Sequence, residues 1–121
     1  MKALVIIAHG SRRAESNDEV TRLTEKVRKQ ADDSFHSVRH AFLELAEPDL
    51  LSVIDELIEN NINEVTILPY FLNSGNHVRQ DIPALLQAAK KQYPHCSFKL
   101  AAAIGMYDGM PELILHSARQ V

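Results

Sequence analysis

The chain has 121 residues, of which 45% are hydrophobic and 24% are charged, and its formal net charge is -3 at pH 7. This composition is typical of one ordinary globular domain with enough residues to bury a core, and the negative charge argues against nucleic-acid binding, which normally needs a basic stripe. No apolar stretch approaches the roughly 20 residues of a membrane span, so we expect neither a nucleic-acid partner nor a membrane partner.

The apolar segment at the start, Ala3-Leu4-Val5-Ile6-Ile7-Ala8, predicts a strand rather than a secretory signal. The apolar run is short, and His9-Gly10-Ser11-Arg12-Arg13 follows it at once with no small-x-small cleavage site. The single Cys96 excludes an internal disulfide and a thiolate-rich zinc site. One cysteine fits a reducing compartment, and we expect a cytoplasmic protein.

Helix-like and strand-like segments then alternate along the chain. Residues 14–31 place Leu23 and Val27 at helical spacing, with acidic residues early and basic residues late, which complements the helix dipole. Residues 64–71 are nearly all apolar, as expected of a strand covered on both faces, and Pro48 suits the first position of a helix. The expected strands are 3–8, 37–45, 64–71 and 97–104, and the expected helices are 14–31, 48–60, 84–91 and 110–120.

This alternation predicts a parallel sheet with right-handed crossovers and helices on both faces. We expect a single three-layer α/β domain over residues 1–121, with a four-stranded parallel sheet in the flavodoxin-like order 2-1-3-4. That order places the first and third strands side by side, with their following helices on opposite faces. Ligands bind outside the carboxyl ends of such strands, where the strand order reverses, so we expect the site there.

Two histidines follow the first and third expected strands. His9 comes directly after the first strand, and His77 ends the polar loop Asn73-Ser74-Gly75-Asn76-His77 after the third. Neighbouring strands lie about 4.8 Å apart, so the two imidazoles can converge on one metal ion or one substrate. The structural alternatives are a strand-to-helix turn in which Ser11 caps the helix, and a surface-loop histidine. A histidine phosphatase would have an arginine before the histidine, whereas Ala8 stands here.

An acidic residue near the end of the second expected strand would complete a metal site. Glu44 stands between Leu43 and Leu45, where an acid in an apolar strand is locally costly. Glu47 has a structural explanation as a residue at a helix start. We therefore favour Glu44 as the functional carboxylate. Two histidines with one carboxylate form a site typical of a first-row transition metal.

Arginines near the same edge are candidates for binding an anionic substrate. Arg12, Arg13 and Arg79 lie close to the two strand ends, and guanidinium groups pair well with carboxylates; the alternative is solvated surface charge. The chain has no Gly-x-Gly-x-x-Gly motif, no Walker loop and only 4 glycines, which argues against a nucleotide-dependent enzyme. The histidines that we do not expect to be ligands are His36, His40, His95 and His116.

Three motifs resemble those of the CbiX family, in chain order. They are Ala8-His9-Gly10-Ser11-Arg12, then Phe42-Leu43-Glu44-Leu45-Ala46-Glu47-Pro48, then Leu68-Pro69-Tyr70-Phe71-Leu72 followed by Gly75-Asn76-His77-Val78-Arg79-Gln80-Asp81-Ile82-Pro83. Members of that family are sirohydrochlorin cobaltochelatases, and closely similar enzymes insert iron or nickel. The resemblance implies a chelatase-like fold, His9 and His77 as a catalytic and metal-binding pair, and Glu44 as a further metal ligand.

The resemblance also implies a reaction. Co²⁺, or else Fe²⁺ or Ni²⁺, enters sirohydrochlorin as a substrate while two pyrrole protons leave, in cobalamin or sirohaem biosynthesis and without an organic cofactor. Neutral imidazole, with a pKa of about 6.5, can hold a metal loosely and accept protons. The expected substrate contacts are Ser11, Arg12, Asn76 and Arg79. Longer members contain two such domains, so this chain resembles the short form, which forms a homodimer with the active site between its subunits.

Two other functions stay open from the residues alone. The same loops would serve a metal or tetrapyrrole carrier without turnover. His9 would also serve a metal-independent hydrolase of phosphate esters. Stoichiometric Co²⁺ binding without insertion would favour the carrier, and activity on phosphate esters would favour the hydrolase.

Overall fold

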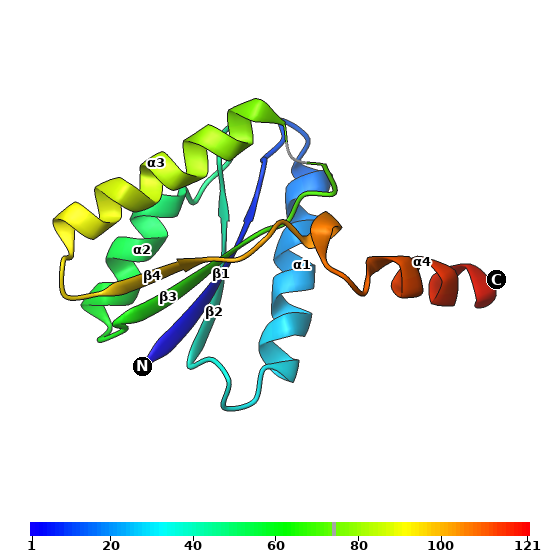
Figure 1. Ribbon diagram of the computed structural model, residues 1–121, viewed down its shortest axis with the longest axis horizontal. Helices are drawn as coiled ribbons and strands as arrows, with labels where there is room; N and C mark the ends of the chain where they lie inside the picture. Colours follow the sequence, from blue (N-terminus) through cyan, green and yellow to red (C-terminus); the bar gives the residue numbers. More distant parts are fainter. Residues whose placement is uncertain (74) are drawn as a thin grey trace.

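A sheet of four parallel strands lies at the centre of the described part of the chain (Figure 1). The computed structural model describes residues 1–73 and 75–121, and for residues 76–79 the helical backbone without the side chains. The order is β2-β1-β3-β4, so the order 2-1-3-4 predicted from the sequence is confirmed. The strands are β1 (Lys2–Ala8), β2 (Ser37–Phe42), β3 (Glu64–Pro69) and β4 (Ser97–Leu100).

Helices cover both faces of this sheet. α2 (Leu50–Glu59) and α3 (Asn76–Gln92) lie together on one face, and α1 (Ala14–Gln30) lies on the other (Figure 1). After β4 come the short 3₁₀ turn η1 (Ile104–Met106) and α4 (Met110–Arg119), which extends away from the sheet (Figure 1). The three-layer α/β architecture expected from the sequence is therefore confirmed.

Most of the core lies on the face of the two central strands that α2 and α3 cover. The alternate residues of β3 are only partly buried, so the complete cover on both faces that the sequence predicts for this strand is not found. Val5 and Ile7 of β1 and Val65 and Ile67 of β3 are completely buried. Each such side chain stabilises the fold by about 1.5–3 kcal/mol on leaving water. The larger apolar cluster joins these strands to α2 and α3, and a smaller cluster joins the ends of β1 and β2 to α1. The edge of the sheet that carries the site is thus held rigidly from both sides.

The second strand ends earlier than the sequence predicts. It stops at Phe42 rather than at residue 45, because Leu45 has a positive φ of 65°, which lies outside the strand region. The Phe42 N–H donates to the Pro48 carbonyl at 2.8 Å, which closes the intervening residues into a loop. α2 then begins at Leu50 with Asp49 as its N-cap, so Pro48 precedes the helix instead of occupying its first position.

The fourth strand is also shorter than predicted, ending at Leu100 instead of residue 104. The Ala101 N–H still donates to the Ile67 carbonyl of β3 at 2.9 Å. The next residue of β3 on that side is Pro69, which has no N–H to continue the ladder. The backbone chemistry of one proline therefore ends the pairing that hydrophobicity alone would extend.

The third helix begins earlier than predicted, at Asn76 rather than residue 84, and it continues through Pro83. A proline inside a helix removes one backbone hydrogen bond and crowds the preceding turn. Ile82 and Leu86 are both buried against the sheet and anchor the helix on either side of the proline. Tertiary packing thus overrides the local signal for a break, and the predicted polar loop ends at the start of α3, which takes up its last two residues, 76 and 77.

The last helix has no cover within the described residues. None of its residues is buried, and Leu113, Ile114 and Leu115 are 54%, 60% and 52% exposed. An amphipathic helix normally buries its apolar side, so α4 presents a candidate contact surface. Separately, no helix in residues 1–73 and 75–121 combines the length and apolar character needed to cross a bilayer.

Candidate active site

His9 is the first residue beyond β1, at the carboxyl edge of the sheet. Its side chain is exposed, and its ring centroid lies 4.3 Å from that of Phe71, which follows β3. The Tyr70 N–H donates to the Ile7 carbonyl at 2.7 Å, so the ends of β1 and β3 meet here. An exposed imidazole therefore stands where the strand order reverses, which is where sheets of this kind bind their ligands.

The loop after β2 lies directly against the loop that carries His9. The Leu43 N–H donates to the Ala8 carbonyl at 2.9 Å, and the Glu44 N–H donates to the His9 carbonyl at 3.0 Å. The side chains of Glu44 and Glu47 are both exposed on this loop. The structure thus brings the backbone of the predicted carboxylate residue beside that of the predicted imidazole.

Gly10 makes this close approach of the two loops possible. Its φ is +91°, a conformation that residues with side chains rarely adopt. A Cβ at this position would lie 1.8 Å from the Glu44 carbonyl oxygen. The glycine after His9 is therefore required by backbone packing.

His77 lies in the first turn of α3, the helix that follows β3. The side chains of Asn76, His77 and Arg79 lie outside the described residues, so the convergence of the two imidazoles and the substrate contacts of Asn76 and Arg79 stay predictions. Among the side chains that are described, no three His, Cys, Asp or Glu residues gather as a metal-binding group. The predicted set of ligands includes His77 and is not tested by that observation.

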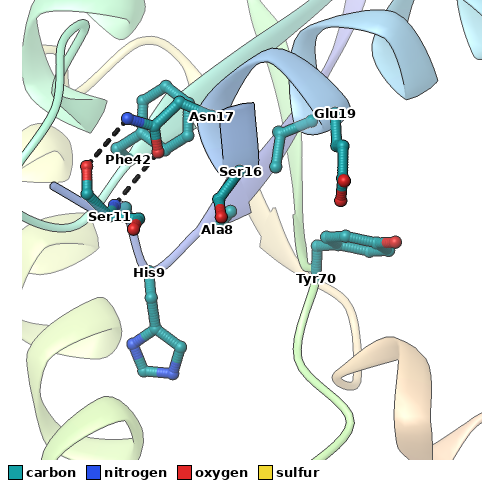
Figure 2. Close-up of a pocket in the computed structure, with 10 residues that line it drawn as sticks. Ala8, His9, Ser11, Ser16, Asn17, Glu19, Phe42 and Tyr70 are labelled. Atoms are coloured by element: carbon teal, nitrogen blue, oxygen red, sulfur yellow. Dashed lines mark hydrogen bonds between the residues drawn. The ribbon is translucent and has the colours of Figure 1, made fainter. Parts of the chain in front are cut away.

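A hollow of about 260 Å³ opens beside His9, between the sheet and α1 (Figure 2). Its lining includes Ser11, Asn17, Glu19 and Tyr70. Figure 2 shows the imidazole of His9 pointing away from these side chains. Pockets for drug-sized ligands usually measure about 300–1,000 Å³, so this hollow suits only a small group. A large planar ligand would therefore need a surface outside this hollow.

Two of the three arginines expected near this edge have described side chains, and both are accessible to ligands. Arg12 and Arg13 are exposed, and Arg13 lies 4.0 Å from Glu15 across a solvent-exposed ion pair. Arg12 also lines a second hollow, of about 350 Å³, together with Glu47. An exposed ion pair of this kind contributes at most about 1 kcal/mol, so the Arg13 guanidinium could exchange it for a carboxylate of a ligand.

The four histidines not predicted to be ligands lie away from the His9 imidazole. His36 and His95 precede β2 and β4, at the opposite end of the sheet, and His116 is on α4. His40 lies within β2, where burial, followed by the positive charge of two nearby arginines, lowers its pKa below 6.5. Because the folded state binds this proton less tightly than the unfolded state, His40 removes stability as the pH falls below 6.5.

Two side chains at this edge carried no recognisable signal in the sequence. Asn17 of α1 bonds to the backbone of Ser11, and Phe71 packs against the His9 ring. A polar residue in an amphipathic helix looks the same whether it faces solvent or a loop. An aromatic residue at the end of an apolar run looks like part of the strand. Only the arrangement of the folded chain identifies them.

Comparison with known proteins shows similarity over nearly the whole chain. The model of the CbiX family matches residues 3–121. A sirohydrochlorin cobaltochelatase of Priestia megaterium is 31% identical over 114 residues, which are 94% of this chain and 36% of that protein. A sirohydrochlorin cobaltochelatase of Methanopyrus kandleri is 34% identical over 86 residues, or 71% of this chain and 59% of that protein. The chloroplastic sirohydrochlorin ferrochelatase of Arabidopsis thaliana is 28% identical over 92% of this chain and 48% of its own.

This chain therefore spans between 36% and 59% of the length of these curated relatives. Two solved structures give the same picture of the fold. A CbiX protein of Marinobacter aquaeolei VT8 has a TM-score of 0.84 and 25% identity, covering 99% of this chain and 96% of that one. The sirohydrochlorin chelatase SirB of Bacillus subtilis subspecies spizizenii, in complex with cobalt, has a TM-score of 0.85 and 21% identity, covering 99% of this chain but 50% of that one.

Proposed function

This chain belongs to the CbiX family, and we propose that it forms one chelatase domain over residues 1–121 that inserts a divalent metal into sirohydrochlorin. The observation that carries the proposal is the exposed imidazole of His9 at the meeting point of β1 and β3, in a chain whose relatives are sirohydrochlorin chelatases. Co²⁺ is the metal that we propose first, because two of the relatives compared are cobaltochelatases. Fe²⁺ and Ni²⁺ suit the same ligands, since affinities for these ions follow one general order at any such site.

In the proposed mechanism the metal is a substrate that His9 and His77 hold through neutral imidazole nitrogens. Imidazole is mostly unprotonated near pH 7 and has no negative charge, so it can release the ion to the four nitrogens of the macrocycle. Insertion forms metal–nitrogen bonds and frees two pyrrole protons. We propose that His9 and His77 accept those protons after the metal has left them. The exposed carboxylate of Glu44 is proposed as a supporting metal ligand or base.

The carboxylates of the substrate are the proposed partners of the polar residues around the two loops. Arg12 is exposed beside His9, where its guanidinium can form a charge-assisted pair with a carboxylate. Ser11, Asn76 and Arg79 are proposed to add hydrogen bonds from the same edge. No organic cofactor takes part in this scheme, and we propose a cytoplasmic location.

We further propose that the active site lies between two copies of this chain. The domain of this chain corresponds to half of SirB, since it covers 50% of that chain, and we propose that a second copy takes the place of the other half. The unburied apolar side of α4, with Leu113 and Ile114 at its centre, is the proposed contact surface. Such a contact would bury side chains that are more than half exposed in the single chain.

A dimer would have twice the 13.6 kDa mass of the chain in light scattering. Replacing both Leu113 and Ile114 with lysine is expected to raise the dissociation constant about 10⁴-fold, since a symmetric contact loses these side chains from both copies and each contributes about 1.5 kcal/mol when buried. Arg119→Gln, on the polar side of the same helix, is the matched control and should leave the mass unchanged. A monomeric wild-type chain would contradict the dimer.

The proposed function is tested by incubating the chain with sirohydrochlorin and Co²⁺, Fe²⁺ or Ni²⁺ in turn. Metal insertion is expected to change the absorption spectrum of the macrocycle over time, at a rate above that of the uncatalysed reaction and proportional to the protein concentration. Binding of one Co²⁺ per site without any acceleration would contradict the chelatase and favour a carrier. The metal with the largest rate constant under equal free concentrations would identify the preferred substrate.

A further inference from the structure

Asn17 holds the loop that follows His9 with both ends of its side-chain amide. Its Oδ1 accepts a hydrogen bond from the Ser11 N–H at 3.0 Å, and its Nδ2 donates to the Ser11 carbonyl at 2.8 Å (Figure 2). Asn17 lies in the first turns of α1, whose N-cap, Arg13, makes no side-chain cap bond. The amide therefore reaches out of the helix and binds both main-chain polar groups of one loop residue, much as a neighbouring strand would.

We call the two bonds between the Asn17 side chain and the Ser11 main chain the Asn17 clamp. Within the described residues, these bonds pair main-chain groups of the loop that no strand or helix pairs. Ser11 belongs to no strand or helix, and its N–H and carbonyl are paired only with Asn17 among the bonds of the described residues. The Ser11 hydroxyl accepts a separate bond from the Arg13 N–H at 3.0 Å. Asn17 and Ser11 are both only partly accessible to solvent, so water replaces this pairing poorly.

The Asn17 clamp can influence His9 because only Gly10 lies between His9 and Ser11, and both of these residues are held by hydrogen bonds. On one side, the His9 carbonyl is held by the Glu44 N–H at 3.0 Å. On the other side, Ser11 is held by Asn17, and between them Gly10 adopts a φ of +91°. Glycine has the greatest backbone freedom of any residue, so without Asn17 the loop after Gly10 could take several conformations, and only the Glu44 bond would hold the His9 carbonyl in its present orientation.

We propose that Asn17 is a positioning residue for His9, an inference that rests on the proposed function. It touches neither the metal nor the macrocycle; it holds the His9 loop so that the imidazole faces the substrate in one orientation. Misplacement of a catalytic group by about 1 Å can lower a rate about 100-fold, so a clamp on the loop backbone affects turnover more than substrate binding.

The test compares Asn17→Ala and Asn17→Asp with a matched control, Asn60→Ala. Asn60 also donates a side-chain bond to a backbone carbonyl, that of Glu56 at 2.8 Å, but at the end of α2 remote from His9. Asn17→Ala is expected to speed hydrogen exchange of the Ser11 amide at least about tenfold and to lower kcat about 10- to 100-fold, with a smaller rise in KM because Ser11 is itself a proposed substrate contact. Asn17→Asp keeps the acceptor for the Ser11 N–H and should recover part of kcat.

Asn60→Ala should leave both the Ser11 exchange rate and kcat at their wild-type values. The positioning role is overturned if Asn17→Ala leaves Ser11 exchange unchanged, or if it frees Ser11 while kcat stays at the wild-type value. A fall in kcat that merely parallels a lower melting temperature, and that Asn60→Ala reproduces, also overturns it. If the wild type inserts no metal, the proposed function fails by itself. The NMR signals of the His9 ring then decide the inference: a shift in Asn17→Ala supports it and identical signals overturn it.

Discussion

Replacing His9 with alanine is expected to lower the rate of metal insertion about 10²- to 10⁴-fold, the usual contribution of a residue that transfers protons in a reaction. The change should cost little stability, because the side chain is exposed and its described ring contact is with Phe71. Losing that aromatic contact removes about 0.5–1.5 kcal/mol. The rate is measured from the absorption of the metallated macrocycle, and the fold by circular dichroism and thermal unfolding.

Two variants separate the chemistry of His9 from its packing. His9→Phe retains a ring against Phe71 but has no nitrogen, so it should be as inactive as His9→Ala while unfolding near the wild-type temperature. His95→Ala removes an exposed histidine at the opposite end of the sheet and should keep the wild-type rate. Near-normal insertion by His9→Phe would show that the imidazole nitrogens take no part in the reaction.

The position of His9 at the carboxyl edge of the sheet could be predicted, because the strand before it and the loop after it are both recognisable from neighbouring residues. The apolar run of β1 is typical of a buried strand in a parallel sheet, and the polar residue directly after such a strand lies at the carboxyl edge. The order of the sheet followed from the alternation of apolar strands and amphipathic helices, and the register of β1 against β3 confirms it. These features depend on hydrophobic pattern, which tertiary contacts seldom reverse.

The features that escaped prediction depend on backbone geometry and on contacts between distant segments. Leu45 was placed in a strand because it is apolar, whereas its positive φ belongs to a loop closed by the bond from Phe42 to Pro48. The third helix was predicted only over residues 84–91, after Pro83, yet packing of α3 on the sheet keeps that proline inside the helix. The hydrogen bonds of Asn17 join a helix to a loop, and no pattern of residue spacing in the sequence predicts them.

Gly10→Ala is expected to lower the free energy of unfolding by about 2–5 kcal/mol. A residue with a side chain held at positive φ costs about 1–2 kcal/mol, and overpacking against a fixed neighbour adds about 1–3 kcal/mol. The neighbour here is the Glu44 carbonyl oxygen, 1.8 Å from the position of the new Cβ. Because that oxygen is backbone, it can move only if the Glu44 loop moves with it.

The matched control is Gly75→Ala, at a glycine whose φ is -76° and whose added Cβ would meet nothing within 4 Å. It should unfold within about 0.5 kcal/mol of the wild type, whereas Gly10→Ala should lower the melting temperature by about 10 °C. In Gly10→Ala the two loops can no longer approach, so the bond from the Glu44 N–H to the His9 carbonyl should also be lost. Hydrogen exchange of the Glu44 amide reports that loss directly. Wild-type stability together with a protected Glu44 amide in Gly10→Ala would mean that the two loops pack without a glycine at this position. The close approach of the Glu44 carbonyl to Gly10, on which this prediction rests, would then be wrong.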